Sequence, residues 1–205
     1  MKFAEMTVAQ FLEALASPDP TPGGGTAAAV SGAMGTSLLV MVTGLAKSNT
    51  NTDEEKAALA TARQALPPLV ATLTQLADAD AAAFDQVMSA YRLPKATDAD
   101  KAARSAAIQA ALQGATTVPL QTLRACALAM AQAEAVATHG NRSAVSDVGV
   151  AMGLLEAAAA GAEANVRINL GSVKDPQFTS AAGDETARLV SEVTRQAAAA
   201  RSRLG

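Results

Sequence analysis

Small side chains dominate this chain and limit the kinds of core that it can build. Alanine supplies about a quarter of the 205 residues, whereas aromatic residues make up 2% and tryptophan is absent. Alanine is the strongest helix former, and small side chains let helices approach one another closely. We therefore predict an all-α protein, a bundle of about six helices around a central helix of small residues. Some of these helices are expected to be long and kinked, and residues 1–205 are expected to form a single domain.

The central helix is predicted in an uncharged stretch that runs from Thr26 to Ala46. Within it Ala28, Gly32 and Gly35 recur at spacings of three and four residues, which places them on one helical face. The stretch is long enough to cross a bilayer, but it is rich in small residues and has no cluster of Lys or Arg at either end. We interpret it as a buried helix between other helices, and expect no membrane partner.

A run of three glycines, Gly23, Gly24 and Gly25, precedes this helix. Glycine costs conformational entropy, so its use indicates a sharp turn or a backbone that lies close to a ligand. A helix that starts there would aim its free N–H groups at an anionic or carbonyl-bearing small molecule. Gly23, Gly25 and Ala28 also fit the dinucleotide-binding pattern, but that pattern requires a preceding strand, and residues 7–17 are predicted to be helical. A turn between helices without a ligand remains the alternative.

Two longer helices are predicted from caps and prolines in the middle of the chain. One begins at the acidic residues 53–55 and runs towards residue 90, with a kink or brief break at Pro67-Pro68. The next is capped by Thr97 or Asp98 and reaches about residue 138, with a bend at Pro119. Both predictions make the bundle elongated.

The last two helices are predicted from polar and glycine residues between apolar runs. Gly140 is expected to end the preceding helix in a left-handed conformation. A fifth helix should span residues 147–169, opened by Ser143 or Ser146, and a final helix should span residues 183–204.

Charge and cysteine content narrow the class of partner. The net charge is −3, and no basic run or set of aromatic residues offers a nucleic-acid surface. The single cysteine, Cys126, excludes an internal disulfide and provides no thiolate metal site. The N-terminus lacks the features of a signal peptide, so we expect a cytoplasmic location and no metal. The single histidine, His139, is interpreted as a residue at a helix C-terminus.

Carboxylates in an apolar stretch are the first candidates for catalysis. Asp78 and Asp80 lie between alanines, and Asp80 shares a helical face with Phe84. If both side chains are buried, desolvation raises the pKa of Asp80 and allows proton exchange near neutral pH. The alternative is that both acids are solvated on the surface.

Further polar residues could contact a substrate. Lys95 follows a stiff Leu-Pro pair and could meet an anionic tail, although an exposed basic loop is an equal alternative. A polar cluster surrounds an apolar helix, and polar groups that become buried need partners: Asn141, Asp147, Asn165, Arg167 and Asn169. Helix capping explains Asn141 and Asp147 adequately, and a solvated helix end would explain Arg167.

Five motifs follow one another along the chain: Pro22-Gly23-Gly24-Gly25-Thr26 with Gly32-Ala33-Met34-Gly35, Asp78-Ala79-Asp80 to Phe84, Arg92-Leu93-Pro94-Lys95, Gly140-Asn141 to Ser146-Asp147, and Asn165-Val166-Arg167-Ile168-Asn169-Leu170. Taken together in this order, they resemble the cyclodeaminase domain of formiminotransferase-cyclodeaminase and its stand-alone bacterial relatives, which include methenyltetrahydrofolate cyclohydrolases. The resemblance spans nearly the whole chain. Arg142 and Ser143 depart from the family pattern and affect expectations about substrate contacts.

The resemblance implies an all-helical homodimer that binds a tetrahydrofolate derivative as its substrate, without a metal or redox cofactor. The catalytic aspartate of the family falls on Asp80, and the glycine loop would hold the pterin or the one-carbon bridge. Lys95 and Arg167 would meet the glutamate tail. The implied substrate-binding set is Gly23, Gly24, Gly25, Lys95, Asn141, Asp147, Arg167 and Asn169.

Two reactions and one non-enzymatic function follow from the resemblance. Because no formiminotransferase domain accompanies these 205 residues, we expect methenyltetrahydrofolate cyclohydrolase activity, which converts 5,10-methenyltetrahydrofolate and water to 10-formyltetrahydrofolate. The alternative is formiminotetrahydrofolate cyclodeaminase activity, which forms 5,10-methenyltetrahydrofolate and releases ammonia. The alternative of another class is a non-catalytic folate-binding helical dimer.

Overall fold

Helices account for nearly all of the described chain, which comprises residues 2–45 and 52–204 of a computed structural model. Within these ranges the structure contains no β-strand, so the all-α prediction is confirmed. The elements are η1 (Phe3–Glu5), α1 (Val8–Ala16), α2 (Gly24–Gly44), α3 (Asp53–Tyr91), α4 (Asp98–His139), η2 (Arg142–Ala144), α5 (Val145–Leu170) and α6 (Pro176–Arg201).

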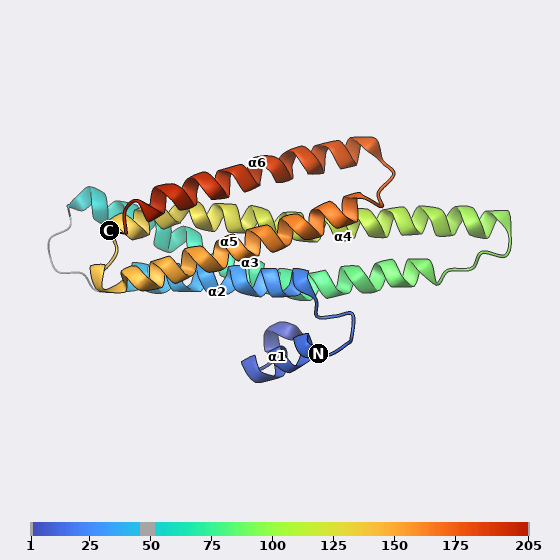
Figure 1. The fold of residues 1–205 in the computed structure, drawn as a ribbon, viewed down its shortest axis with the longest axis horizontal. Coiled ribbons are helices and arrows are strands. Elements are labelled where there is room, and N and C mark those ends of the chain that lie inside the picture. The colour runs from blue at the N-terminus through green and yellow to red at the C-terminus, as the bar shows by residue number, and fades with distance from the viewer. Residues whose placement is uncertain (1, 46–51, 205) are drawn as a thin grey trace.

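The five longer helices run along one axis and form an elongated bundle, whereas α1 lies outside it (Figure 1). α2 packs against α3, α4 and α5, and α4 in turn packs against α3, α5 and α6. At one end the α3–α4 pair extends beyond the other helices (Figure 1). This arrangement brings the start of α2 alongside the middle of α3.

Small residues let α2 pack closely against its neighbours. A Cβ atom built on Gly32 would lie 3.1 Å from the Cys126 sulfur, and one on Gly35 would lie 2.7 Å from the Ala151 carbonyl oxygen. Ala28, on the same stripe, is buried. The predicted central helix of small residues is therefore confirmed, and it begins at Gly24 and ends at Gly44. Ala46, the predicted last residue of the uncharged stretch, lies outside the described residues.

The helix starts that carry strong capping signals lie where the sequence predicts them. Thr7 forms a capping box with Gln10 at the start of α1, and Thr97 forms one with Asp100 at the start of α4. α3 begins at Asp53. In each case a side chain near in sequence accepts an N–H group that the first helical turn leaves free.

Of the predicted kink or brief break at Pro67-Pro68, the break is wrong, because α3 continues through both prolines. Both are exposed, so water can satisfy the carbonyl groups that lose their N–H partners. Leu66 and Leu73 on either side are fully buried and anchor both halves of the helix in the core. α4 is also one continuous helix through Pro119, and the bend expected there stays a prediction.

Two predictions near the last helices are also corrected. Gly140 has φ −66°, not a left-handed value; glycine is needed because a Cβ atom would lie 2.4 Å from the Val136 carbonyl oxygen. α6 begins at Pro176, seven residues before the predicted start at 183. Asp175 caps it by accepting N–H groups from the first turn, and proline suits the first helical position.

Two segments meet the length and composition of a membrane span, Gly24–Gly44 and Arg142–Leu170. Core helices of helical bundles meet the same criteria, so this property is weak evidence for a membrane. In α2, half of the apolar window is buried inside the bundle. Its contacts with three other helices agree with the interpretation as a central helix.

Candidate active site

Asp80 projects from the middle of α3 towards the first turn of α2. The Thr26 hydroxyl donates a hydrogen bond to Asp80 Oδ2 at 3.0 Å. Gly25 makes room for the carboxylate, since a Cβ atom there would lie 2.2 Å from Oδ1 and 2.6 Å from Cγ. The glycine loop and the candidate catalytic acid, 55 to 57 positions apart in the sequence, therefore form one site.

The start of α2 explains why a carboxylate is held there. Gly23 is the N-cap residue and has no side chain to accept the free N–H groups of the first turn. The Asp80 carboxylate takes this position from the neighbouring helix, beside the hydroxyl and backbone N–H of Thr26. The positive end of the helix dipole favours the ionised form.

Burial nevertheless dominates the protonation of Asp80. Desolvation raises its pKa above the ordinary value, while the hydrogen bonds from the Thr26 hydroxyl and backbone lower it in part. The direction agrees with the hypothesis of a desolvated Asp80, but Phe84 is 36% exposed, so the predicted burial beside its ring is wrong. A half-buried carboxylate with a raised pKa can accept a proton and return it.

Asp78, the second carboxylate of the motif, has a structural contact instead. Its Oδ1 accepts a hydrogen bond from the Phe3 backbone N–H at 2.6 Å. Phe3 also packs edge-to-face against Phe11, with ring centroids 6.5 Å apart. Asp78 thereby ties the N-terminal segment to α3, two residues from Asp80.

The C-terminal part of α5 approaches the same end of α2. Asn165 comes nearest to the glycine loop, since its Nδ2 would lie 3.9 Å from a Cβ atom on Gly24. Asn169 donates a hydrogen bond to the Ala115 carbonyl oxygen at 2.7 Å and so joins α5 to α4. Arg167 is exposed and pairs with Glu163 at 2.6 Å.

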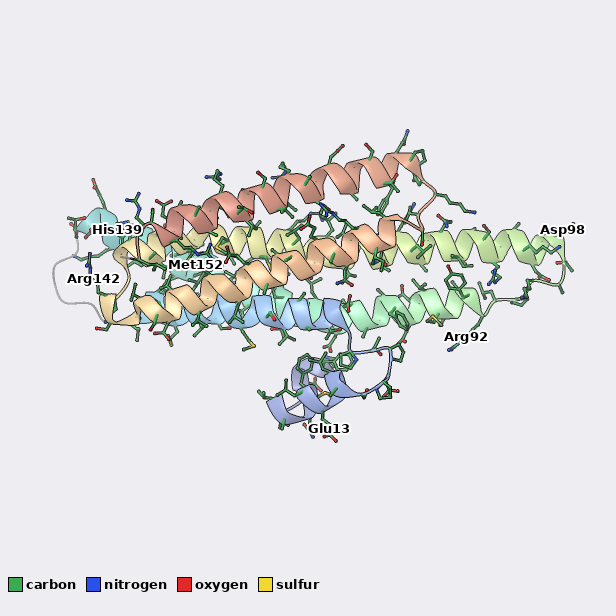
Figure 2. The ribbon with its side chains drawn as sticks, in the orientation of Figure 1. Glu13, Arg92, Asp98, His139, Arg142 and Met152 are labelled. Atoms are coloured by element: carbon green, nitrogen blue, oxygen red, sulfur yellow. The ribbon has the colours of Figure 1, made fainter. Side chains whose placement is uncertain are left out.

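The remaining predicted residues lie apart from Asp80 within one chain. Lys95 is exposed and follows the end of α3, which lies about 16 Å along the helix axis from Asp80. Asn141 and Asp147 lie near the opposite end of α5, with Asp147 about 27 Å along the axis from Asn165. Figure 2 shows this separation: Arg92 and Asp98 lie at one end of the bundle, and His139 and Arg142 at the other.

Sequence reasoning did not assign a role to Thr26. Its side chain is fully buried and makes the hydrogen bond to Asp80 that is described above. The available signal was its position directly after the three glycines, in the first turn of a helix whose N-cap residue lacks a side chain.

Fold and site together define an all-helical protein with a partly desolvated carboxylate at a helix N-terminus, a class suited to acid–base chemistry on a small molecule. The chain belongs to the formiminotransferase-cyclodeaminase family, whose model matches residues 7–188.

Named relatives include two kinds of protein. The chain is 44% identical over 186 residues to the methenyltetrahydrofolate cyclohydrolase of Methylorubrum extorquens, with 91% of this chain and 89% of that protein covered. It is 38% identical to the formimidoyltransferase-cyclodeaminase of Sus scrofa, over 95% of this chain but 36% of that longer protein. The crystal structure of formiminotetrahydrofolate cyclodeaminase from Thermotoga maritima has a TM-score of 0.86 at 26% identity, covering 98% of this chain and 96% of that one.

Proposed function

We propose that this protein is a methenyltetrahydrofolate cyclohydrolase with Asp80 as its catalytic residue. The observation that carries the proposal is the Asp80 carboxylate, desolvated and held against the first turn of α2 by Gly25 and Thr26. The similarity to the Methylorubrum extorquens cyclohydrolase, which extends over most of both chains, favours this reaction. We also propose that residues 1–205 form a single domain and that the protein is located in the cytoplasm.

The substrate of this reaction is a cation, and its chemistry suits a buried carboxylate. Water attacks the amidinium carbon of 5,10-methenyltetrahydrofolate, and Asp80 accepts one proton of that water as the C–O bond forms. The carbon–N5 bond then breaks, and the proton on Asp80 passes to N5. The hydroxyl proton is released to solvent, leaving a formyl group on N10. The carboxylate also stabilises the positive charge of the bound substrate.

The glycine loop and the end of α5 are the proposed substrate-binding elements beside Asp80. Gly23, Gly24 and Gly25 are proposed to bring the backbone close to the pterin or the one-carbon bridge. At Gly25 a side chain would also occupy the space of the Asp80 carboxylate. Asn169 and Arg167 lie in the last turns of α5, at the end of that helix where Asn165 approaches Gly24. Arg167 is proposed to meet the glutamate tail.

We further propose a homodimer in which the site draws on two copies of the chain. Asn141 and Asp147 are too far from Asp80 along α5 to contact the same small molecule within one copy. Lys95 lies beyond the end of α3, which is about 16 Å along the helix axis from Asp80. An antiparallel arrangement of two copies would bring Asn141 and Asp147 of one copy towards Asp80 of the other, while Lys95, at the other end of the bundle, is proposed to meet the glutamate tail.

Cyclodeamination is the second candidate, favoured by the TM-score of 0.86 to the Thermotoga maritima cyclodeaminase. In this reaction N10 attacks the formimino carbon of 5-formiminotetrahydrofolate. With the formimino nitrogen already protonated in the substrate, Asp80 accepts the N10 proton and delivers it to that nitrogen in the adduct, so that ammonia leaves and the amidinium cation forms. Both reactions pass through an adduct in the same five-membered ring, so one carboxylate can serve either.

Absorbance of methenyltetrahydrofolate in the near ultraviolet tests the proposal. Loss of the band on addition of protein, at a pH where spontaneous hydrolysis is slow, is expected for the cyclohydrolase. Appearance of the band from formiminotetrahydrofolate, with ammonia release, would instead assign the cyclodeaminase. Folate binding without either change would support a non-catalytic folate-binding dimer.

The variant that tests the role of Asp80 is Asp80→Asn, which we expect to abolish turnover while sparing folate binding. Asp85→Asn, an exposed acid on the same helix, is the control and should retain the wild-type rate. Normal turnover by Asp80→Asn would refute the role of Asp80.

A further inference from the structure

We infer that Thr26 is a positioning residue for the Asp80 carboxylate, fixing the orientation in which it exchanges the proton. The inference rests on the proposed role of Asp80. Thr26 lies on α2 and Asp80 on α3, so the 3.0 Å bond from the Thr26 hydroxyl to Oδ2 joins two helices at the site. This bond holds the carboxylate in one orientation towards water or substrate.

Comparison with the other buried threonines shows that this contact is unusual within the described chain. Thr36, Thr116 and Thr186 each donate to the carbonyl oxygen four residues earlier in their own helix, at 2.7 to 2.8 Å. Thr122 does the same at 3.4 Å. Such bonds are the ordinary solution for a buried helical hydroxyl.

Thr26 cannot use that solution, because the residue four positions earlier, Pro22, precedes the helix. Its hydroxyl is instead directed to the carboxylate of another helix, in a position with no exposed surface. The Asp80 carboxylate also fills the space beside Gly25, so Gly25 and Thr26 together fix its position and orientation. A misplaced proton acceptor lowers the rate even where the substrate still binds.

Thr26→Val tests the inference because it removes the hydroxyl and keeps the side-chain shape. We expect kcat to fall about 10- to 100-fold with little change in KM. Loss of a hydrogen bond to the ionised form raises the pKa of Asp80, so the acid limb of the pH–rate profile should move up by about one pH unit. Thr26→Ser keeps the hydroxyl and should restore both.

Thr186→Val is the matched control, since it removes an equally buried threonine hydroxyl whose bond stays within α6. It should leave kcat and the pH profile unchanged. A wild-type pH profile in Thr26→Val, or the same losses in Thr186→Val, would overturn the inference.

The carboxyl ¹³C chemical shift of Asp80, followed by NMR through a pH titration, separates this inference from the proposed function. A rise in the pH at which Asp80 titrates in Thr26→Val supports positioning by Thr26, even if the wild-type chain turns over neither folate substrate. An unchanged titration overturns it whatever the activity. Absence of turnover in the wild type would overturn the proposed function alone.

Discussion

Gly25→Ala is expected to separate catalysis from stability. The new Cβ atom would lie 2.2, 2.6 and 2.7 Å from the three carboxyl atoms of Asp80. To reach ordinary contact distance the carboxylate has to move by about 1 Å, which breaks the bond to Thr26. A displacement of this size at a reacting group costs about 100-fold in rate.

The free energy of unfolding should change little in the same variant. The Asp80 side chain can rotate away from the new methyl group, and alanine is favoured over glycine in a helix by roughly 0.8–1 kcal/mol. Turnover is measured by the methenyltetrahydrofolate absorbance and stability by thermal unfolding. Gly183→Ala, with nothing within 4 Å of the new Cβ atom, is the control and should keep wild-type turnover with slightly raised stability.

Turnover of Gly25→Ala within twofold of the wild-type rate would refute the reasoning. So would a large loss of stability with the rate preserved, because the clash would then have been relieved by movement of α2 and not of Asp80.

Two further predictions concern stability. Gly35→Ala should lower the unfolding free energy by about 1–3 kcal/mol, because its Cβ atom would meet the Ala151 carbonyl oxygen of the backbone at 2.7 Å; an unchanged melting temperature would contradict this. Asp80→Asn should be more stable than the wild type at pH 7. Burial raises the pKa of Asp80, so the folded chain binds the proton more tightly than the unfolded chain does. The wild type therefore loses stability as the pH rises above the ordinary carboxyl range. The difference should disappear in acid, and Asp85→Asn, an exposed acid, should show none at either pH.

Local sequence predicted most helix starts, because the side chains that accept the free N–H groups of a first helical turn lie close to it in the sequence. Thr7 and Thr97 cap their helices through residues three positions away, as the sequence indicated. The start of α6 carried an equally local signal in Asp175-Pro176, which the prediction of residue 183 overlooked. Local sequence could not predict the continuity of α3 through Pro67 and Pro68, because it depends on which side of the helix faces water.

Residue types and resemblance identified the glycine loop and Asp80, but not how they meet. That meeting depends on α2 packing against α3, which places Gly25 and Thr26 against a carboxylate more than 50 positions away. The same packing separates Lys95, Asn141 and Asp147 from Asp80, although motif order alone grouped them into one site.

The sequence by itself determined an all-helical chain with a small-residue central helix, because helix propensity and the spacing of glycines and alanines act over a few residues. Tertiary structure alone decided the environment of Asp80. Desolvation, the donor from Thr26 and the space at Gly25 arise only when two distant segments pack together, and no local pattern specifies that contact.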